Sequence, residues 1–173
     1  SWLGMTMHSR VTVVLCRDWD DFHRFVPTIR GRVGGVTIGS AIYLTPRIAA
    51  KHLDLGEYLR HELTHALVGQ NVPLWRLPRL EKRSWLYEGV PVWVGRQQSY
   101  ATHQEFLAQA RTLDLAGVID TAHPSSDMRF NYVAWRNFID YLDHTHGRAA
   151  FLDFYHAYLA DPDAELARFQ SIF

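Results

Sequence analysis

Five consecutive residues, His61-Glu62-Leu63-Thr64-His65, carry the chemistry that most narrows the function of this 173-residue chain. On an α-helix each residue turns by about 100°, so positions i and i+4 lie one above the other on the same face. Both imidazoles can therefore reach one Zn²⁺ ion at about 2.0–2.1 Å, with Glu62 beside them at the height of a metal-bound water. The pentapeptide predicts a zinc hydrolase site. Because the chain holds 10 histidines, a chance origin of so short a motif is the alternative.

A catalytic zinc needs a third protein ligand and one open position. Glu88, in the segment Trp85-Leu86-Tyr87-Glu88-Gly89-Val90, is the predicted third ligand. A carboxylate on a second helix packed beside the first would complete a tetrahedral site. The segment around Glu88 is strongly apolar, and a charge there would be costly without a partner. Taken alone, Glu88 would more often be a solvated helix glutamate, and its pairing with the histidine motif reverses that preference.

The bulk composition narrows the class of protein without identifying it. A hydrophobic content of 47% with 21% charged residues is ordinary for a globular chain. The formal net charge of zero gives no argument for a nucleic acid or an anionic membrane as partner. The single cysteine, Cys16, excludes an intrachain disulfide and a cysteine zinc cluster. No apolar run predicts a transmembrane helix and the first residues lack signal-peptide features, so compartment and oligomeric state stay open.

The pattern of apolar residues and breakers predicts strands first and helices afterwards. The expected strands span residues 10–16, 36–38 and 41–44, the last two around Gly39. The expected helices span residues 18–26, 55–68, 85–97, 102–115, 129–144 and 148–160, with a last one starting at Pro162. Residues 71–83 read as a connecting loop. This order predicts a single α+β domain over residues 1–173, mixed over about 1–70 and helical over about 71–173.

Local signals place the boundaries of the two helices that carry the candidate ligands. Asp54 and Glu57 form a capping box for the motif helix, and Gly69 is its expected stop. Ser84 is the expected cap of the second helix, which Pro91 would end early or kink. The apolar stripe of the motif helix is expected from Leu55, Leu59, Leu63, Ala66 and Leu67, with both histidines at its edge.

His61-Glu62-x-x-His65 followed by Trp85-Leu86-x-Glu88-Gly89 resembles the gluzincin metallopeptidases, the aminopeptidase N-like branch and its small peptidase MA-like relatives. The resemblance implies a zincin-like, thermolysin-like fold. Such a fold has a small N-terminal mixed sheet with an edge strand over the cleft, an active-site helix and a C-terminal helical subdomain. It implies one Zn²⁺ bound by His61, His65 and Glu88, with Glu62 as general base toward the zinc-bound water.

Two further positions enter through the same resemblance. Tyr132 opens an aromatic helical pattern similar to the one that begins with the family's catalytic tyrosine, which donates a hydrogen bond to the oxyanion. A buried core tyrosine is the alternative for Tyr132. Gly39, Ser40, Ala41 and Ile42 resemble the edge strand along which such enzymes align a peptide by strand addition.

One departure from the family shapes the expected activity. Aminopeptidases of this family carry Gly-Ala-Met-Glu-Asn on that strand, and its glutamate grips the substrate amino terminus, whereas residues 39–43 hold no acid. The sequence therefore favours an endopeptidase that acts on a peptide or protein substrate. The first alternative is a latent or non-catalytic zincin scaffold that binds a peptide or protein partner, with the apolar segment 166–173 covering the zinc. Hydrolysis of a non-peptide amide or epoxide by the same residues is a further alternative.

Overall fold

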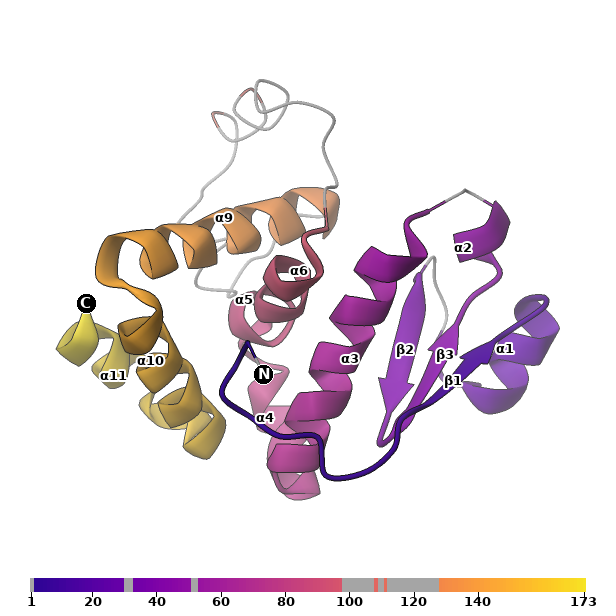
Figure 1. The fold of residues 1–173 in the computed structure, drawn as a ribbon, viewed down its shortest axis with the longest axis horizontal. Coiled ribbons are helices and arrows are strands. Elements are labelled where there is room, and N and C mark those ends of the chain that lie inside the picture. The colour runs from indigo at the N-terminus through magenta and orange to yellow at the C-terminus, as the bar shows by residue number, and fades with distance from the viewer. Residues whose placement is uncertain (1, 30–32, 51–52, 98–107, 109–110, 112–127) are drawn as a thin grey trace. The chain divides into compact units, whose positions relative to one another are not determined.

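The computed structural model describes residues 2–29, 33–50, 53–97, 108, 111 and 128–173, and it is of the α+β class (Figure 1). The chain divides into two compact units, Ser1–Asn71 and Val72–Phe173. In the first unit the elements are β1 (Thr12–Leu15), α1 (Trp19–Phe25), β2 (Gly35–Ile38), β3 (Ala41–Leu44), α2 (Arg47–Ala50) and α3 (Leu55–Asn71). In the second they are η1 (Leu74–Arg76), α4 (Leu77–Leu80), α5 (Ser84–Tyr87), α6 (Gly89–Gly95), α9 (Met128–His146), α10 (Arg148–Ala160), η2 (Pro162–Ala164) and α11 (Glu165–Ile172). Most of the helix predicted over residues 102–115 lies outside the described part.

The sheet of the first unit has three strands in the order β1-β3-β2. The central strand β3 runs parallel to β1 and antiparallel to β2, so that Ala41 faces Thr12 on one side and Ile38 on the other. Gly39, in the turn between β2 and β3, has φ +58°. That left-handed conformation is open to glycine because it has no Cβ. The predicted pair of strands around Gly39 is confirmed.

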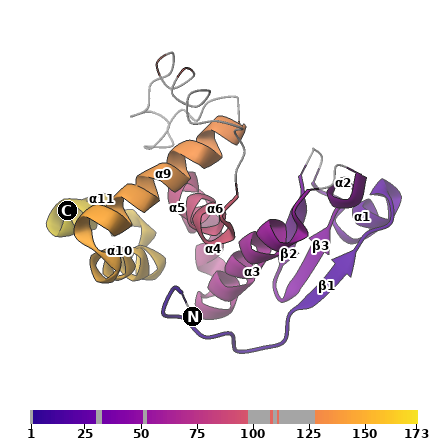
Figure 2. The same ribbon diagram turned by 45° about the horizontal axis from the view of Figure 1, so that its top comes forward.

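Helices α1 and α3 pack on opposite faces of this sheet (Figures 1 and 2). Val36 and Tyr43 contact the cluster formed by Cys16, Phe22 and Val26, which includes the buried side of α1. Gly35, with the side chain of Leu44 beside it, instead faces Glu62 of α3. Successive residues of a strand point to opposite faces, so β2 presents Gly35 and Thr37 to α3 and presents Val36 to α1.

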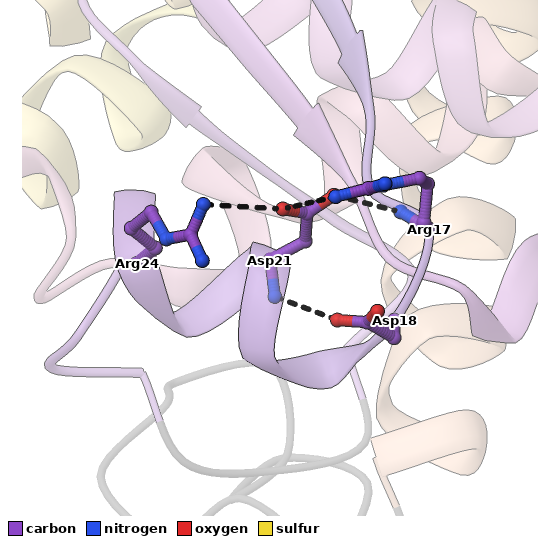
Figure 3. A network of polar contacts seen from close by, with 4 residues as sticks. All are labelled: Arg17, Asp18, Asp21 and Arg24. Carbon is purple, nitrogen blue, oxygen red and sulfur yellow. Dashed lines mark hydrogen bonds and ion pairs between the residues drawn. The ribbon is translucent and has the colours of Figure 1, made fainter.

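The predicted cap of α1 is confirmed. Oδ1 of Asp18 accepts a hydrogen bond from the backbone N–H of Asp21 at 2.8 Å (Figure 3). Asp21 also forms ion pairs with Arg17 at 2.9 Å and with Arg24 at 3.8 Å. The hydrogen bond from Arg17 lowers the pKa of Asp21. Both arginine side chains are exposed, so the cap contributes more to α1 than the ion pairs do.

Helix α3 begins as predicted and ends later than predicted. Oδ1 of Asp54 accepts a hydrogen bond from the backbone N–H of Glu57 at 3.1 Å, as a capping residue does. The predicted stop at Gly69 is wrong, because the helix continues to Asn71. Nothing lies within 4 Å of the position that a Cβ on Gly69 would occupy. A glycine inside a helix costs only about 1 kcal/mol, so neighbouring contacts can override it.

The predicted apolar stripe of α3 is wrong at Leu55 and Leu63. Leu55 and Leu63 are 44% and 37% exposed, whereas His61 and Glu62 are only 6% and 5% exposed. Ala66 is the one residue of the predicted stripe that is fully buried. The helix turns part of its polar motif toward β2, because Glu62 finds a hydrogen-bond partner on that strand.

Three predictions about the start of the second unit need correction. Residues 71–83 are not a loop, since they hold η1 and α4. Ser84 is the first residue of α5 and not its cap, a position that Arg83 occupies. The single helix expected over residues 85–97 is two helices, α5 and α6, which meet at Glu88. Pro91 lies in the first turn of α6, where a missing N–H costs nothing, so it does not end the helix.

The remaining helices follow the predicted order with shifted ends. α9 extends to His146, and α10 has the predicted bounds. Pro162 begins the short η2, and α11 starts only at Glu165. Phe169 and Phe173 of the C-terminal segment pack on Phe154 of α10 with ring centroids 5.6 Å away in both cases. Within the described residues, none of the helices has the length and apolarity that crossing a membrane requires.

Candidate metal site

The two motif histidines lie one turn apart on α3, and their side chains converge. The Nε2 atoms of His61 and His65 are 3.1 Å apart, and their ring centroids are 4.9 Å apart. Two nitrogens that each lie 2.0–2.1 Å from one tetrahedral ion are about 3.3 Å apart. The pair therefore has nearly the separation that a shared metal ion requires. A hydrogen bond between two neutral imidazoles is compatible with the same distance.

Glu62 is held against β2 by a hydroxyl group. Oγ1 of Thr37 donates a hydrogen bond to Oε2 of Glu62 at 2.7 Å and lies 3.0 Å from the backbone oxygen of the same residue. The glutamate that the sequence assigns as general base thus has a defined orientation. Sequence reasoning did not identify Thr37. In the sequence, Thr37 is distinguished only by its position two residues after Gly35 on a strand. That position points to Glu62 only once it is known that β2 packs against α3.

Gly35 makes room for the carboxylate of Glu62. A Cβ atom at Gly35 would stand 2.9 Å from Oε1 of Glu62 and 3.0 Å from Cδ2 of Leu44. At the neighbouring Gly34, a Cβ would meet the ring of Tyr58 at 2.0 Å. These separations are shorter than carbon atoms tolerate, so the glycines allow α3 to approach the strand closely. The pair is the second feature that sequence reasoning did not connect with the site.

In the second unit, Glu88 lies at the junction of α5 and α6 and is half-buried. The hydroxyl of Tyr132, on α9, donates a hydrogen bond to Oε2 of Glu88 at 3.0 Å. Trp85 and Leu86, which precede Glu88, are buried. The Glu88 carboxylate therefore lies next to apolar residues and has a hydroxyl group as hydrogen-bond partner. This agrees with the expectation that a charge without a partner would be costly at this position.

Gly89 brings α6 and α9 together next to Glu88. A Cβ at Gly89 would lie 2.8 Å from Cβ of Trp135 and 3.0 Å from Cδ1 of Ile139. Only a residue without a side chain permits this approach. Tyr132 lies one turn before Trp135 on α9. The close packing of Gly89 against Trp135 therefore also places the hydroxyl of Tyr132 near Glu88.

Among the residues that the structure describes, His61, His65 and Glu88 form a group whose ligand atoms all lie within 4.8 Å of one another. Each side chain offers one ligand atom, two of them imidazole nitrogens and the third a carboxylate oxygen. Two histidines and one glutamate make up a known donor set of catalytic zinc. The residues thus fit a metal ion, and the predicted group of three ligands is present.

The strand predicted to receive a peptide is not at the sheet edge. Gly39 and Ser40 form the turn, while Ala41 and Ile42 belong to the central strand β3 and pair with strands on both sides. Their backbone groups are already used within the sheet, so an added strand cannot bind there. The described sheet ends instead at β1 and β2.

Comparison of the chain with known protein families, with curated proteins and with solved structures gives no match. The class that fold and site define is an α+β protein with a His-His-Glu group close enough to hold one metal ion.

Proposed function

We propose that the chain is a zinc-dependent metallopeptidase of the gluzincin type, with a zincin-like fold, and that it hydrolyses peptide bonds. The observation that carries this proposal is the group of His61, His65 and Glu88, together with a glutamate next to the first histidine. A structural metal site has no need of a base beside its ligands, whereas a hydrolytic site does.

The metal proposed for the group is Zn²⁺, held by His61, His65 and Glu88. When bound there, it would polarise the scissile carbonyl and lower the pKa of a water in its open position. Glu62 would accept a proton from the attacking water and pass it to the departing amine. Tyr132 would support the oxyanion in the role that the family resemblance gives it, moving from its contact with Glu88.

The substrate proposed is an extended segment of a peptide or protein. β2 is a sheet edge and carries Thr37, which contacts Glu62, so strand addition along β2 would place a peptide backbone near the base. Residues 39–43 provide no acidic group for a substrate amino terminus. We therefore favour cleavage within a chain over removal of its first residue.

The decisive experiment compares Glu62→Gln with the native protein in metal content and in cleavage of a mixed-peptide library, with and without chelator. The native protein should cleave, chelator should stop it, and Glu62→Gln should retain its metal and lose hydrolysis by at least about 10²-fold, as expected for a general base. His65→Ala is the matched control, since it should lose the metal as well. Hydrolysis by metal-loaded Glu62→Gln, or a metal-loaded native protein that binds peptides without cleaving them, would overturn the assignment. The second result would favour a non-catalytic scaffold.

A further inference from the structure

The hydroxyl group of Thr37 has two acceptors on one residue. Oγ1 lies 2.7 Å from Oε2 of Glu62 and 3.0 Å from the backbone oxygen of Glu62. A hydroxyl carries one hydrogen and two lone pairs, so it can donate to only one of these oxygens at a time. A helical carbonyl oxygen has a second lone pair beyond its helix hydrogen bond, so the backbone oxygen remains able to accept. Both distances are those of real hydrogen bonds.

We infer that Thr37 is a positioning residue for Glu62. Its hydroxyl stands between Oε2 and the backbone oxygen of Glu62, so it ties the end of that side chain to the strand and fixes the direction in which the carboxylate points. The inference rests on the proposed role of Glu62 as general base.

The surroundings of Thr37 keep this contact in place. Antiparallel pairing with Ile42 fixes its backbone in β2, and its β-branched side chain has few rotamers. Gly35, on the same face of the strand, lies against the other carboxylate oxygen. Glu62 is therefore bounded on both oxygens by one strand, which holds the carboxylate in one place.

The test uses Thr37→Val, which keeps the shape and removes the hydroxyl, and Thr37→Ser, which keeps the hydroxyl. We expect Thr37→Val to lower kcat by about 10–100-fold, as for loss of a hydrogen bond to a charged group, with KM and zinc affinity within about twofold of native. Thr37→Ser should restore most of kcat. Thr45→Val is the matched control, because the Thr45 hydroxyl lies 2.9 Å from the backbone oxygen of Val33 and 3.1 Å from that of Gly34, and it bonds to these rather than to the carboxylate of Glu62. It should lower the melting temperature without lowering kcat of the folded protein.

A second readout does not depend on hydrolysis. In protein labelled with ¹³C at glutamate carboxyl carbons, the Glu62 resonance, assigned by its loss in Glu62→Gln, should shift in Thr37→Val and return in Thr37→Ser. An unmoved resonance would show that the contact is absent and would overturn the inference, whatever the native activity. A shifted resonance with kcat unchanged, or with equal loss in Thr37→Ser, would also overturn it. A shifted resonance in a native protein without peptidase activity would instead refute the proposed function, and with it the catalytic part of the inference.

Discussion

The phenolic hydroxyl of Tyr132 donates a hydrogen bond to Oε2 of Glu88 at 3.0 Å. The sequence resemblance assigns this tyrosine to the oxyanion, and the structure shows its hydroxyl on a candidate metal ligand. Groups that hydrogen-bond a metal ligand fix its orientation, and their loss typically weakens metal binding by 10–100-fold. The contact therefore gives Tyr132 an effect on the metal that can be measured apart from catalysis.

We expect Tyr132→Phe to bind Zn²⁺ about 10–100-fold more weakly than the native protein, as measured by competition with a chromophoric chelator. Tyr141→Phe is the control, because Tyr141 lies on the same helix and is 56% exposed. Native affinity in Tyr132→Phe, together with loss of kcat at saturating zinc, would assign the hydroxyl to the oxyanion alone.

Gly35→Ala should reduce activity and stability together. Its Cβ would stand 2.9 Å from Oε1 of Glu62, so either the carboxylate or the strand must move. We expect a melting temperature several degrees lower, as for a loss of about 1–3 kcal/mol, and a larger fall in kcat than the fraction unfolded explains.

Gly69→Ala is the control for Gly35→Ala, and it should raise the stability of the protein instead of lowering it. A Cβ there meets nothing within 4 Å, and the residue lies inside α3. We expect a gain of about 0.5–1 kcal/mol in the free energy of unfolding, measured by urea denaturation. A loss of stability would show that residue 69 does not have the helical conformation and open surroundings that favour alanine.

The ion pair between Asp143 and Arg148 joins the end of α9 to the start of α10 across Gly147. The hydrogen bond from Arg148 lowers the pKa of Asp143 in the folded protein. A lowered folded-state pKa stabilises the protein above the unfolded value of about 4, and that stabilisation is lost as the pH falls through the folded value. The difference in melting temperature between the native protein and Asp143→Asn should therefore be largest near neutral pH and shrink below about pH 4. A difference that grows on acidification would contradict this sign.

The C-terminal segment offers a test of latency. Phe169 packs on Phe138 and Phe154, and Phe173 packs on Phe154 and His146. Removing residues 169–173 should lower the melting temperature by exposing these rings, and it should not raise peptide hydrolysis. A rise in hydrolysis upon truncation would show that this segment restrains the site, as the latent alternative supposes.

The sequence predicts correctly those features of the fold that depend on one or two neighbouring residues, such as helix caps and tight turns. Asp18 and Asp54 cap their helices, Gly39 turns a hairpin, and α10 follows directly after Gly147. The spacing of His61 and His65 likewise needs only a helix to bring their nitrogens together. These features depend on a few neighbouring residues, which is the range over which sequence patterns act.

Features that depend on distant parts of the chain were not predictable in this way. Placing β3 in the centre of the sheet requires β1 to pair with it across 29 residues, from Thr12 to Ala41. The contact of Thr37 with Glu62 follows only from the face of α3 that meets β2. The burial of His61 and the exposure of Leu63 likewise depend on packing between elements, which the helical pattern does not contain. The close packing of Gly89 against Trp135, directly after the break at Glu88, is a contact that a helical pattern does not contain.

Strand β2, four residues long, contacts Glu62 on one face and forms an edge of the sheet along its outer side. The backbone of Gly35 and the side chain of Thr37 border the carboxylate of Glu62, while the outer backbone of the same strand is the sheet edge available to a peptide. A strand added to a sheet lies about 4.8 Å from its neighbour. Under the proposed function, the separation between base and substrate would be set by the spacing of backbones, which varies little, rather than by flexible side chains. β2 would then fix the distance between Glu62 and the peptide backbone. A shift of the peptide along the strand would change which bond is cut, but it would leave that distance unchanged.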